Sequence, residues 1–369
     1  MQRIPARIGD AQDAIETPAL VVDLDRFERN LERMAAAAKP LRLRPHAKSH
    51  KCATIAKAQI ARGAVGICCQ KTDEAAAFVD AGIRDVLVTN EVVAPRKVER
   101  LADLARRARI GVLVDAMAPI AMLARAARHA ESTLDVYVEL DVGAHRCGVA
   151  SPDVAADVAR VVSSAPGLRF RGLHAYHGAA QHLREPQARA RAIASAARIA
   201  RSARRRILAS GMRCDVVTGA GSGTWRHERD SGVYDELQPG SYVFMDVDYA
   251  RNLPADGDVR FEQSLFVVAG VMSTPSREQA VVDAGLKAFA FDSGLPQVAR
   301  RDDVEYVKAS DEHGVLRVAP HASPPALDDR VWLVPGHCDP TVNLYDWLVG
   351  VRNGVVEDVW PIEARGALG

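Results

Sequence analysis

The 369-residue sequence lacks several features that would have fixed its class at once. No apolar run approaches the roughly 20 residues of a membrane-spanning helix, and a formal charge of +1 gives no indication of a nucleic acid or an acidic membrane surface as partner. The six cysteines lack the paired spacing of disulfide frameworks or zinc fingers. Residues 1–13 lack the apolar core of a secretory signal. We therefore expect a cytoplasmic protein with neither a membrane nor a nucleic-acid partner.

Strand-like and helix-like stretches alternate along the first two thirds of the chain. The expected strands are residues 41–44, 65–69, 85–89, 110–114, 134–141, 168–174, 213–218 and 237–244. Ala- and Arg-rich stretches of helical period separate them, which predicts a (β/α)8 barrel of the TIM type, with a doubly wound sheet as the alternative. After about Arg251, short strand-like runs between Gly, Pro, Asp and Ser predict a mainly antiparallel β domain.

The sequence predicts three parts. Residues 1–24 form an N-terminal segment that packs on the β domain, residues 25–255 form the barrel, and residues 256–369 form the C-terminal β domain. Because no internal repeat and no low-complexity linker occurs, we expect the two domains to pack closely.

The stretch from Leu43 to Lys51 follows the first expected strand and concentrates positive charge. If this stretch is extended, His46, Lys48 and His50 emerge on one side, because they alternate. Crowded cations lower the pKa of a lysine, and a partly neutral lysine suits Schiff-base chemistry with an aldehyde cofactor. A solvated basic turn is the alternative.

Further polar clusters follow other expected strands, where barrel enzymes place their chemistry. Two glycines bracket His145 and Arg146, and three histidines and a tyrosine fall within residues 174–182. Residues 218–224 read TGAGSGT, a turn whose backbone N–H groups suit phosphate. The loop typical of nucleoside triphosphate sites is absent. A phosphate site together with a strand-end lysine suggests pyridoxal 5′-phosphate.

The β domain contains the stretch VPGHCDPT at residues 334–341. In an extended conformation His337 and Asp339 would point to the same side and Cys338 to the other. One imidazole and one carboxylate with open positions suit a divalent ion such as Mg²⁺ or Mn²⁺ better than a thiolate-rich zinc site. A structural turn is the alternative.

Together these motifs resemble the alanine-racemase-like, fold-type III family of pyridoxal-phosphate enzymes, in its branch of D-threonine aldolases and D-serine dehydratases. The stretches that carry the resemblance are residues 17–24, 44–51, 141–148, 176–182, 218–223, 236–242 and 335–341. It implies a (β/α)8 barrel followed by a mainly β domain, a homodimer, pyridoxal 5′-phosphate as cofactor, and a divalent metal, Mn²⁺ or Mg²⁺ before Zn²⁺.

The resemblance also implies residue roles. Lys48 forms the Schiff base with the cofactor, Arg146 lies beside the cofactor ring, and Tyr176 lies near the ring or the substrate. His182 faces the 3-hydroxyl of the substrate. The residues that help hold the phosphate are Gly221, Ser222, Gly223 and Tyr242, and the residues that bind the metal are His337 and Asp339.

Position 339 separates the two branches, because the dehydratase branch has a cysteine there and this chain has Asp339. The resemblance therefore implies an aldolase that cleaves D-3-hydroxy amino acids of the D-threonine type to glycine and an aldehyde. The alternatives are a D-serine or 3-hydroxy-D-aspartate dehydratase, a 3-hydroxy-D-aspartate aldolase, a racemase and a non-catalytic cofactor-binding protein. For a substrate with a second carboxylate, Arg44, Arg226 or Arg251 could bind it.

Overall fold

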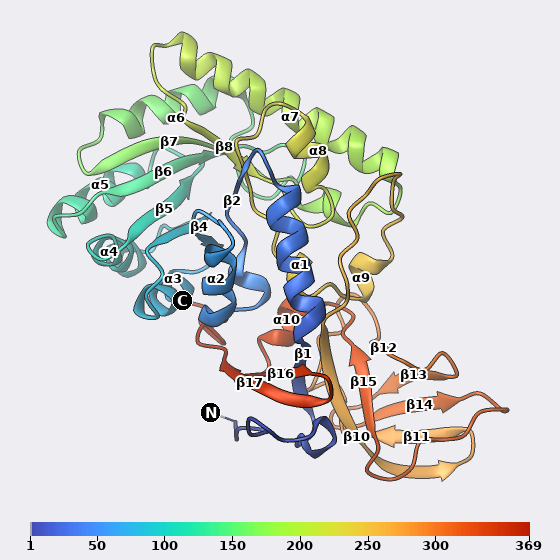
Figure 1. Cartoon of the computed structure of the whole chain (residues 1–369). Helices are drawn as coiled ribbons and strands as arrows, with labels where there is room; N and C mark the ends of the chain where they lie inside the picture. Colours follow the sequence, from blue (N-terminus) through green and yellow to red (C-terminus); the bar gives the residue numbers. More distant parts are fainter. Residues whose placement is uncertain (1) are drawn as a thin grey trace.

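Eight parallel strands form the barrel in the computed structural model, which describes residues 2–369 (Figure 1). The sheet runs in the order β2 (Arg42–Leu43), β9 (Glu236–Leu237), β8 (Val216–Gly219), β7 (Leu168–Ala175), β6 (Leu134–Glu139), β5 (Arg109–Val114), β4 (Asp85–Glu91) and β3 (Ile67–Cys69). A parallel bridge between His46 and Cys68 joins the chain after β2 to β3 and closes the ring. The predicted barrel is confirmed.

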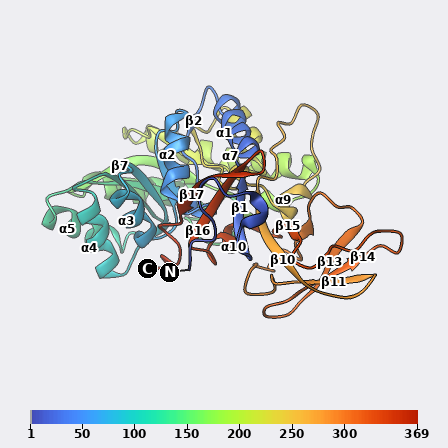
Figure 2. The ribbon, with the colours of Figure 1, turned by 60° about the horizontal axis from the view of Figure 1, so that its bottom comes forward.

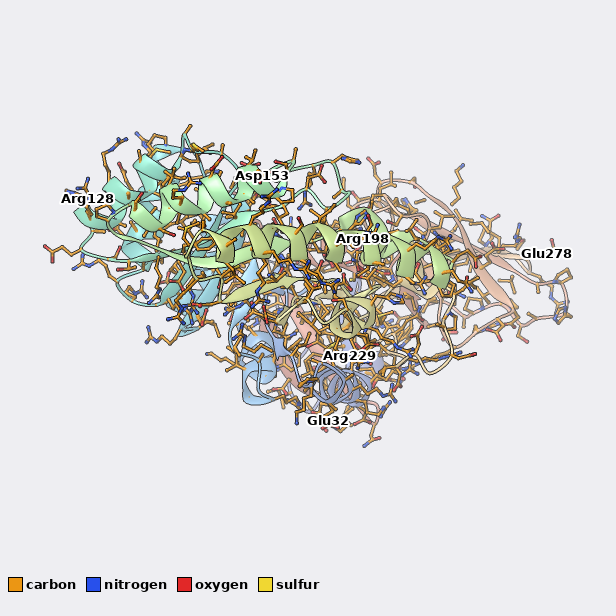
Figure 3. The ribbon with its side chains drawn as sticks, turned by 90° about the horizontal axis from the view of Figure 1, so that it is seen from above. Glu32, Arg128, Asp153, Arg198, Arg229 and Glu278 are labelled. Carbon is orange, nitrogen blue, oxygen red and sulfur yellow. The ribbon has the colours of Figure 1, made fainter. Side chains whose placement is uncertain are left out.

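Helices cover the outside of this barrel. They are α2 (Ala53–Ala61), α3 (Thr72–Asp80), α4 (Pro95–Leu104), α5 (Ile120–His129), α6 (Pro152–Ser164), α7 (Pro186–Ala209) and α8 (Trp225–Asp230). The longest, α7, buries an Ala- and Ile-rich face and exposes arginines such as Arg198 (Figure 3), as expected of an amphipathic surface helix. None of the helices within residues 2–369 has both the length and the apolar character that crossing a membrane requires.

The interior of the barrel is packed rather than open. Buried side chains from five of its strands form one apolar cluster inside it, namely Cys68, Leu87, Leu113, Tyr137 and Val216. Towards the amino ends of the strands, Arg44 pairs with Glu236 and Asp85, at 3.0 and 2.6 Å. Access for a ligand is therefore confined to the carboxyl ends of the strands.

The second sheet is mainly antiparallel, as predicted, and also takes up the first strand of the chain (Figure 2). Its strands are β1 (Ala19–Asp23), β10 (Leu265–Ser276), β11 (Gln279–Val282), β12 (Gln297–Val298), β13 (Val304–Ala309), β14 (Gly314–Val318), β15 (Arg330–Val334), β16 (Trp347–Arg352) and β17 (Val355–Pro361). Strand β1 lies between β10, which is antiparallel to it, and β16, which is parallel.

The remaining helical elements complete the fold. Helix α1 (Leu24–Ala37) follows β1, and the remaining short elements are η1 (Gln12–Ala14), η2 (Ala47–Ser49), η3 (Gly178–His182), η4 (Ser241–Val243), α9 (Val247–Ala250) and α10 (Cys338–Val342). The buried Asp246 carboxylate accepts backbone N–H bonds from Tyr249 and Cys338, each 2.9 Å long. One side chain therefore ties α9, which follows the barrel strands, to α10 in the β domain.

Candidate active site

Most of the residues predicted to carry chemistry lie around one cavity of about 260 Å³ at the carboxyl ends of the barrel strands. Of the predicted residues, the lining includes Lys48, Arg146, Tyr176, His182, Gly221 and Ser222. Those outside the lining are Gly223, Tyr242, His337 and Asp339. Gly223 and Tyr242 lie next to lining residues along the chain, and Asp339 contacts the lining residue Lys48. The residues come from different strand ends, which only the closed barrel brings together.

The backbone around Lys48 is not extended, so the expected alternation of His46, Lys48 and His50 is wrong. After Pro45 the chain forms the 3₁₀ helix η2, in which three residues complete a turn. His46 lines the cavity and its Nδ1 accepts the Lys48 backbone N–H at 3.3 Å. His50 is fully buried and instead accepts the Cys52 backbone N–H.

The charge environment of Lys48 also differs from the prediction. Burial lowers the pKa of Lys48, but contact with the Asp339 carboxylate, together with Tyr176, outweighs burial and raises the pKa above its ordinary value. Burial, followed by the charge of Lys48, lowers the pKa of His46, so that this ring is neutral. The nearest charge to Lys48 is therefore a carboxylate from the other domain, and not the neighbouring histidines.

His337 is extended but the helix α10 begins at the next residue, so the expectation of an extended segment through Asp339 is wrong. Asp339 lies in the first turn of α10, where Pro340 is tolerated because the first N–H groups of a helix have no partner within it. Asp339 contacts Lys48 Nζ and accepts a 3.3 Å hydrogen bond from Ser241 Oγ. His337 caps α10, and its Nδ1 lies 2.7 Å from an Asp292 carboxylate oxygen.

The Gly-rich turn after β8 is packed against Gln181, a residue that the sequence analysis did not single out. A Cβ at Gly221 would lie 2.4 Å from Gln181 Oε1, and one at Gly223 would lie 2.5 Å from the Gln181 carbonyl oxygen. Gln181 Oε1 also accepts the Gly223 N–H at 3.0 Å. Both glycines are therefore needed for this close packing. A Gly-rich stretch indicates that some group approaches closely, but it does not identify that group as Gln181.

The cavity side of this turn fits a phosphate group. Within residues 2–369, the backbone N–H groups of Gly221 and Ser222 donate to no protein acceptor, although Gly221 is buried. Ser222 Oγ instead accepts the Tyr242 backbone N–H at 2.9 Å. Adjacent free N–H groups beside a cavity lysine form the kind of concave anion site that holds phosphate.

Tyr242 contacts the Gly-rich turn through its backbone N–H, and its side chain is buried. The hydroxyl accepts a 3.1 Å hydrogen bond from Gln59 Nε2, and the ring packs against Phe261 with centroids 5.6 Å apart. In this bond the hydroxyl of Tyr242 only accepts, so its hydrogen is left to donate to an acceptor such as a phosphate oxygen. The contact between the Tyr242 backbone and Ser222 adds to the predicted phosphate role of Tyr242, which stays a prediction.

Arg146 and Tyr176 form one wall of the cavity. The Arg146 guanidinium lies 6.0 Å from the centroid of the Tyr176 ring, and it approaches Glu139 to 4.0 Å. His174 completes this wall, with its Nε2 3.1 Å from Gln238 Oε1. Sequence reasoning missed Gln238 because it treated residues 237–244 as one strand, whereas β9 ends at Leu237.

A second group of possible metal ligands lies near this wall. Within residues 2–369, Glu91, Asp115 and Cys147 are the only set of three such side chains whose ligand atoms come within 4.8 Å of one another. Burial, followed by the neighbouring Glu139 and Asp115, raises the pKa of Glu91 to about 8. A proton on this carboxyl competes with a metal ion for the same oxygen atoms.

Comparison with known proteins agrees with this geometry. The sequence model of one family, described as alanine racemase, N-terminal domain, matches residues 22–248, which is more than half of the chain. This chain belongs to the alanine racemase N-terminal domain family. A second family model, described as a putative serine dehydratase domain, matches residues 264–351. In this member of the alanine racemase N-terminal domain family, the first match covers the barrel and the second covers most of the β domain.

Several characterised relatives align over nearly all of the chain. A D-threonine aldolase from Arthrobacter sp. is 48% identical, with 98% of this chain and 96% of the relative covered. A 3-hydroxy-D-aspartate aldolase from Paracoccus denitrificans is 46% identical, with 98% and 95% covered. A D-threo-3-hydroxyaspartate dehydratase from Delftia sp. is 33% identical, with 89% and 92% covered. The crystal structure of D-threonine aldolase from Filomicrobium marinum superimposes with a TM-score of 0.97 at 49% identity, covering 99% and 100% of the two chains.

Proposed function

We propose that this protein is an aldolase that depends on pyridoxal 5′-phosphate and a divalent metal and cleaves D-3-hydroxy amino acids of the D-threonine type to glycine and an aldehyde. The observation that carries the proposal is the contact between Lys48 and Asp339 at the mouth of the barrel. It unites the lysine expected to bind an aldehyde cofactor with the carboxylate expected to bind a metal. The 48% identity to a D-threonine aldolase, against 33% to a dehydratase, supports the same conclusion.

The chain provides a group for each part of this reaction. Pyridoxal phosphate, when bound, supplies the electron sink for breaking the Cα–Cβ bond. Lys48 holds its aldehyde carbon, and the N–H groups of Gly221 and Ser222 hold its phosphate. His182 faces the cavity and accepts the proton of the substrate 3-hydroxyl.

The metal site would be formed by His337 and Asp339. Two protein ligands leave positions for water and substrate oxygen, as Mg²⁺ and Mn²⁺ prefer. The Asp292 contact at Nδ1 of His337 leaves Nε2 to face a cation. A bound divalent ion lowers the pKa of the hydroxyl that it contacts. We also propose a cytoplasmic location and a homodimer.

A 3-hydroxy-D-aspartate aldolase is the second candidate, because the relatives include one. Its substrate needs a cation for a second carboxylate. Arg44 and Arg226 already pair with buried or partly buried carboxylates. The Arg251 side chain is half exposed, donates to the Ser293 carbonyl oxygen at 3.1 Å and lies 3.8 Å from the Asp248 carboxylate, so its ion pair is longer than those of Arg44 and Arg226.

Product analysis with D-threonine tests the proposal. We expect glycine and acetaldehyde, lost on treatment with a chelator and restored by Mn²⁺. Ammonia and 2-oxobutanoate would instead identify a dehydratase. If D-threonine is inert and 3-hydroxy-D-aspartate gives glycine and glyoxylate, the second candidate is correct.

A further inference from the structure

Two residues of α9 contact the imidazole of His182. The Asp248 carboxylate oxygen Oδ2 lies 2.5 Å from Nδ1 of His182. Tyr249, the next residue of α9, packs its ring against the imidazole with centroids 5.5 Å apart. Two neighbouring residues of one helix therefore fix both the hydrogen bonding and the tilt of this ring.

Asp248 is itself held firmly. Arg184 contacts the Asp248 carboxylate oxygen Oδ1 and donates to the Asp248 backbone carbonyl at 2.7 Å, and a further 2.7 Å bond joins Arg184 to Asn252. The Asp248 side chain is only 9% exposed. Burial raises its pKa, but the hydrogen bonds from Arg184 and His182 outweigh burial and lower the pKa below its ordinary value. Asp248 is therefore an ionised group that only accepts hydrogen bonds.

A hydrogen-bond acceptor at one ring nitrogen determines which of the two nitrogens of a neutral imidazole carries the proton. A neutral imidazole that donates from Nδ1 carries its lone pair on Nε2. Within residues 2–369, Nδ1 is the only nitrogen of the His182 ring that a protein group contacts by a hydrogen bond. Because His182 lines the cavity with Lys48 and Tyr176, Nε2 is the nitrogen available to a ligand there.

We propose that Asp248 is a positioning residue that fixes the Nδ1–H tautomer of His182, so that Nε2 is the base that receives the proton of the substrate 3-hydroxyl. This inference rests on the proposed function. The O–H bond breaks and its proton moves to Nε2. The electron pair left on oxygen becomes the carbonyl bond of the aldehyde as the Cα–Cβ bond breaks, and the electrons of that bond pass to the cofactor. The imidazolium that forms then faces the Asp248 carboxylate.

Kinetics of the holoenzyme with saturating metal test the inference. For Asp248→Asn we expect kcat to fall by about 100-fold, the usual contribution of a general base, with KM changed by less than about threefold. Asp248→Glu keeps the carboxylate, so its kcat should be about tenfold higher than that of Asp248→Asn. In a His182→Ala background, Asp248→Asn should cause no further loss, because residues that act as a unit are not additive. Asp303→Asn, which removes a carboxylate held by Arg301, should leave kcat within about twofold.

A measurement that does not depend on turnover accompanies the kinetics. The ¹⁵N resonances of His182, assigned by difference from His182→Ala, should show a protonated Nδ1 and an unprotonated Nε2 in the neutral wild-type ring. An Nε2–H tautomer in the wild type overturns the inference, even if Asp248→Asn does not fold. An unchanged kcat in Asp248→Asn, or an equal loss with and without His182, also overturns it. If the wild type releases no aldehyde, the proposed function fails, and the resonances alone decide whether Asp248 sets the tautomer.

Discussion

Replacing Glu228 with glutamine is expected to change how the stability of the protein depends on pH. Glu228 lies in α8, directly after the Gly-rich turn, and is completely buried. Its Oε1 accepts a 2.8 Å hydrogen bond from Thr224, while Oε2 has no hydrogen-bond partner in the described part of the chain, residues 2–369. Burial raises the pKa of Glu228 to about 7. The folded protein therefore favours the neutral carboxyl, which glutamine resembles in shape and charge.

The sign and the size follow from linkage between protonation and folding. The stabilising effect of the neutral carboxyl is fully present below the unfolded pKa of 4.5 and is lost as pH rises through the folded pKa near 7. That difference in pKa corresponds to about 3 kcal/mol of unfolding free energy. For a chain of 369 residues this is a shift of about 4 °C in Tm. The Tm of Glu228→Gln minus the Tm of the wild type should therefore be about 4 °C larger at high pH than at low pH.

Thermal unfolding of both holoenzymes at about pH 5 and about pH 8 measures this growth. Comparing the variant with the wild type at each pH cancels the other groups that titrate. Asp230→Asn, an exposed change at the end of the same helix, is the matched control and should show no such growth. A Tm difference between Glu228→Gln and wild type that is the same at both pH values would refute the reasoning.

The remaining predictions concern the Gly-rich turn, the proposed metal site and the amino-end side of the barrel. Gly223→Ala should weaken pyridoxal phosphate binding by about tenfold or more in a spectroscopic titration, because its Cβ would meet the Gln181 carbonyl oxygen; unchanged affinity would contradict this. Asp292→Asn should lower Mn²⁺ affinity by about 10-fold to 100-fold in calorimetry, since it removes the group that orients His337; equal affinity would dismiss that role. Asp135→Ala should lower the unfolding free energy by about 2 kcal/mol in denaturant, because it leaves the surrounding arginines without their buried carboxylate; an unchanged midpoint would contradict it.

Much of the fold could be predicted from the sequence because its elements are strongly periodic. The expected strands at residues 110–114, 134–141 and 168–174 agree with β5, β6 and β7 to within two residues at each end. The expected strand at residues 237–244 is wrong beyond Leu237, since Pro239 and Gly240 end it and η4 follows. Periodicity does not report where the backbone turns after a proline, and the same omission caused the errors at residues 46–50 and 337–339.

The site was less accessible to sequence reasoning than the fold. Strand-end motifs pointed to Lys48 and His182, and the structure places both at one cavity. Their partners Asp339 and Asp248 could not be matched to them, because one lies 291 and the other 66 positions away along the chain. Contacts between distant segments decide the pKa of Lys48, and no local pattern carries that information.

The position of β1 has a consequence for how the chain acquires its structure during synthesis. Val21 pairs with Phe266 on one side and with Val349 on the other, so this strand leaves the ribosome long before either partner exists. The barrel strands pair only among themselves and can fold in the meantime. The second sheet is complete only after β16 and β17 have emerged, and the His337 and Asp339 segment emerges shortly before these strands. A nascent chain therefore gains its lysine site first and its proposed metal site last, when translation is nearly complete.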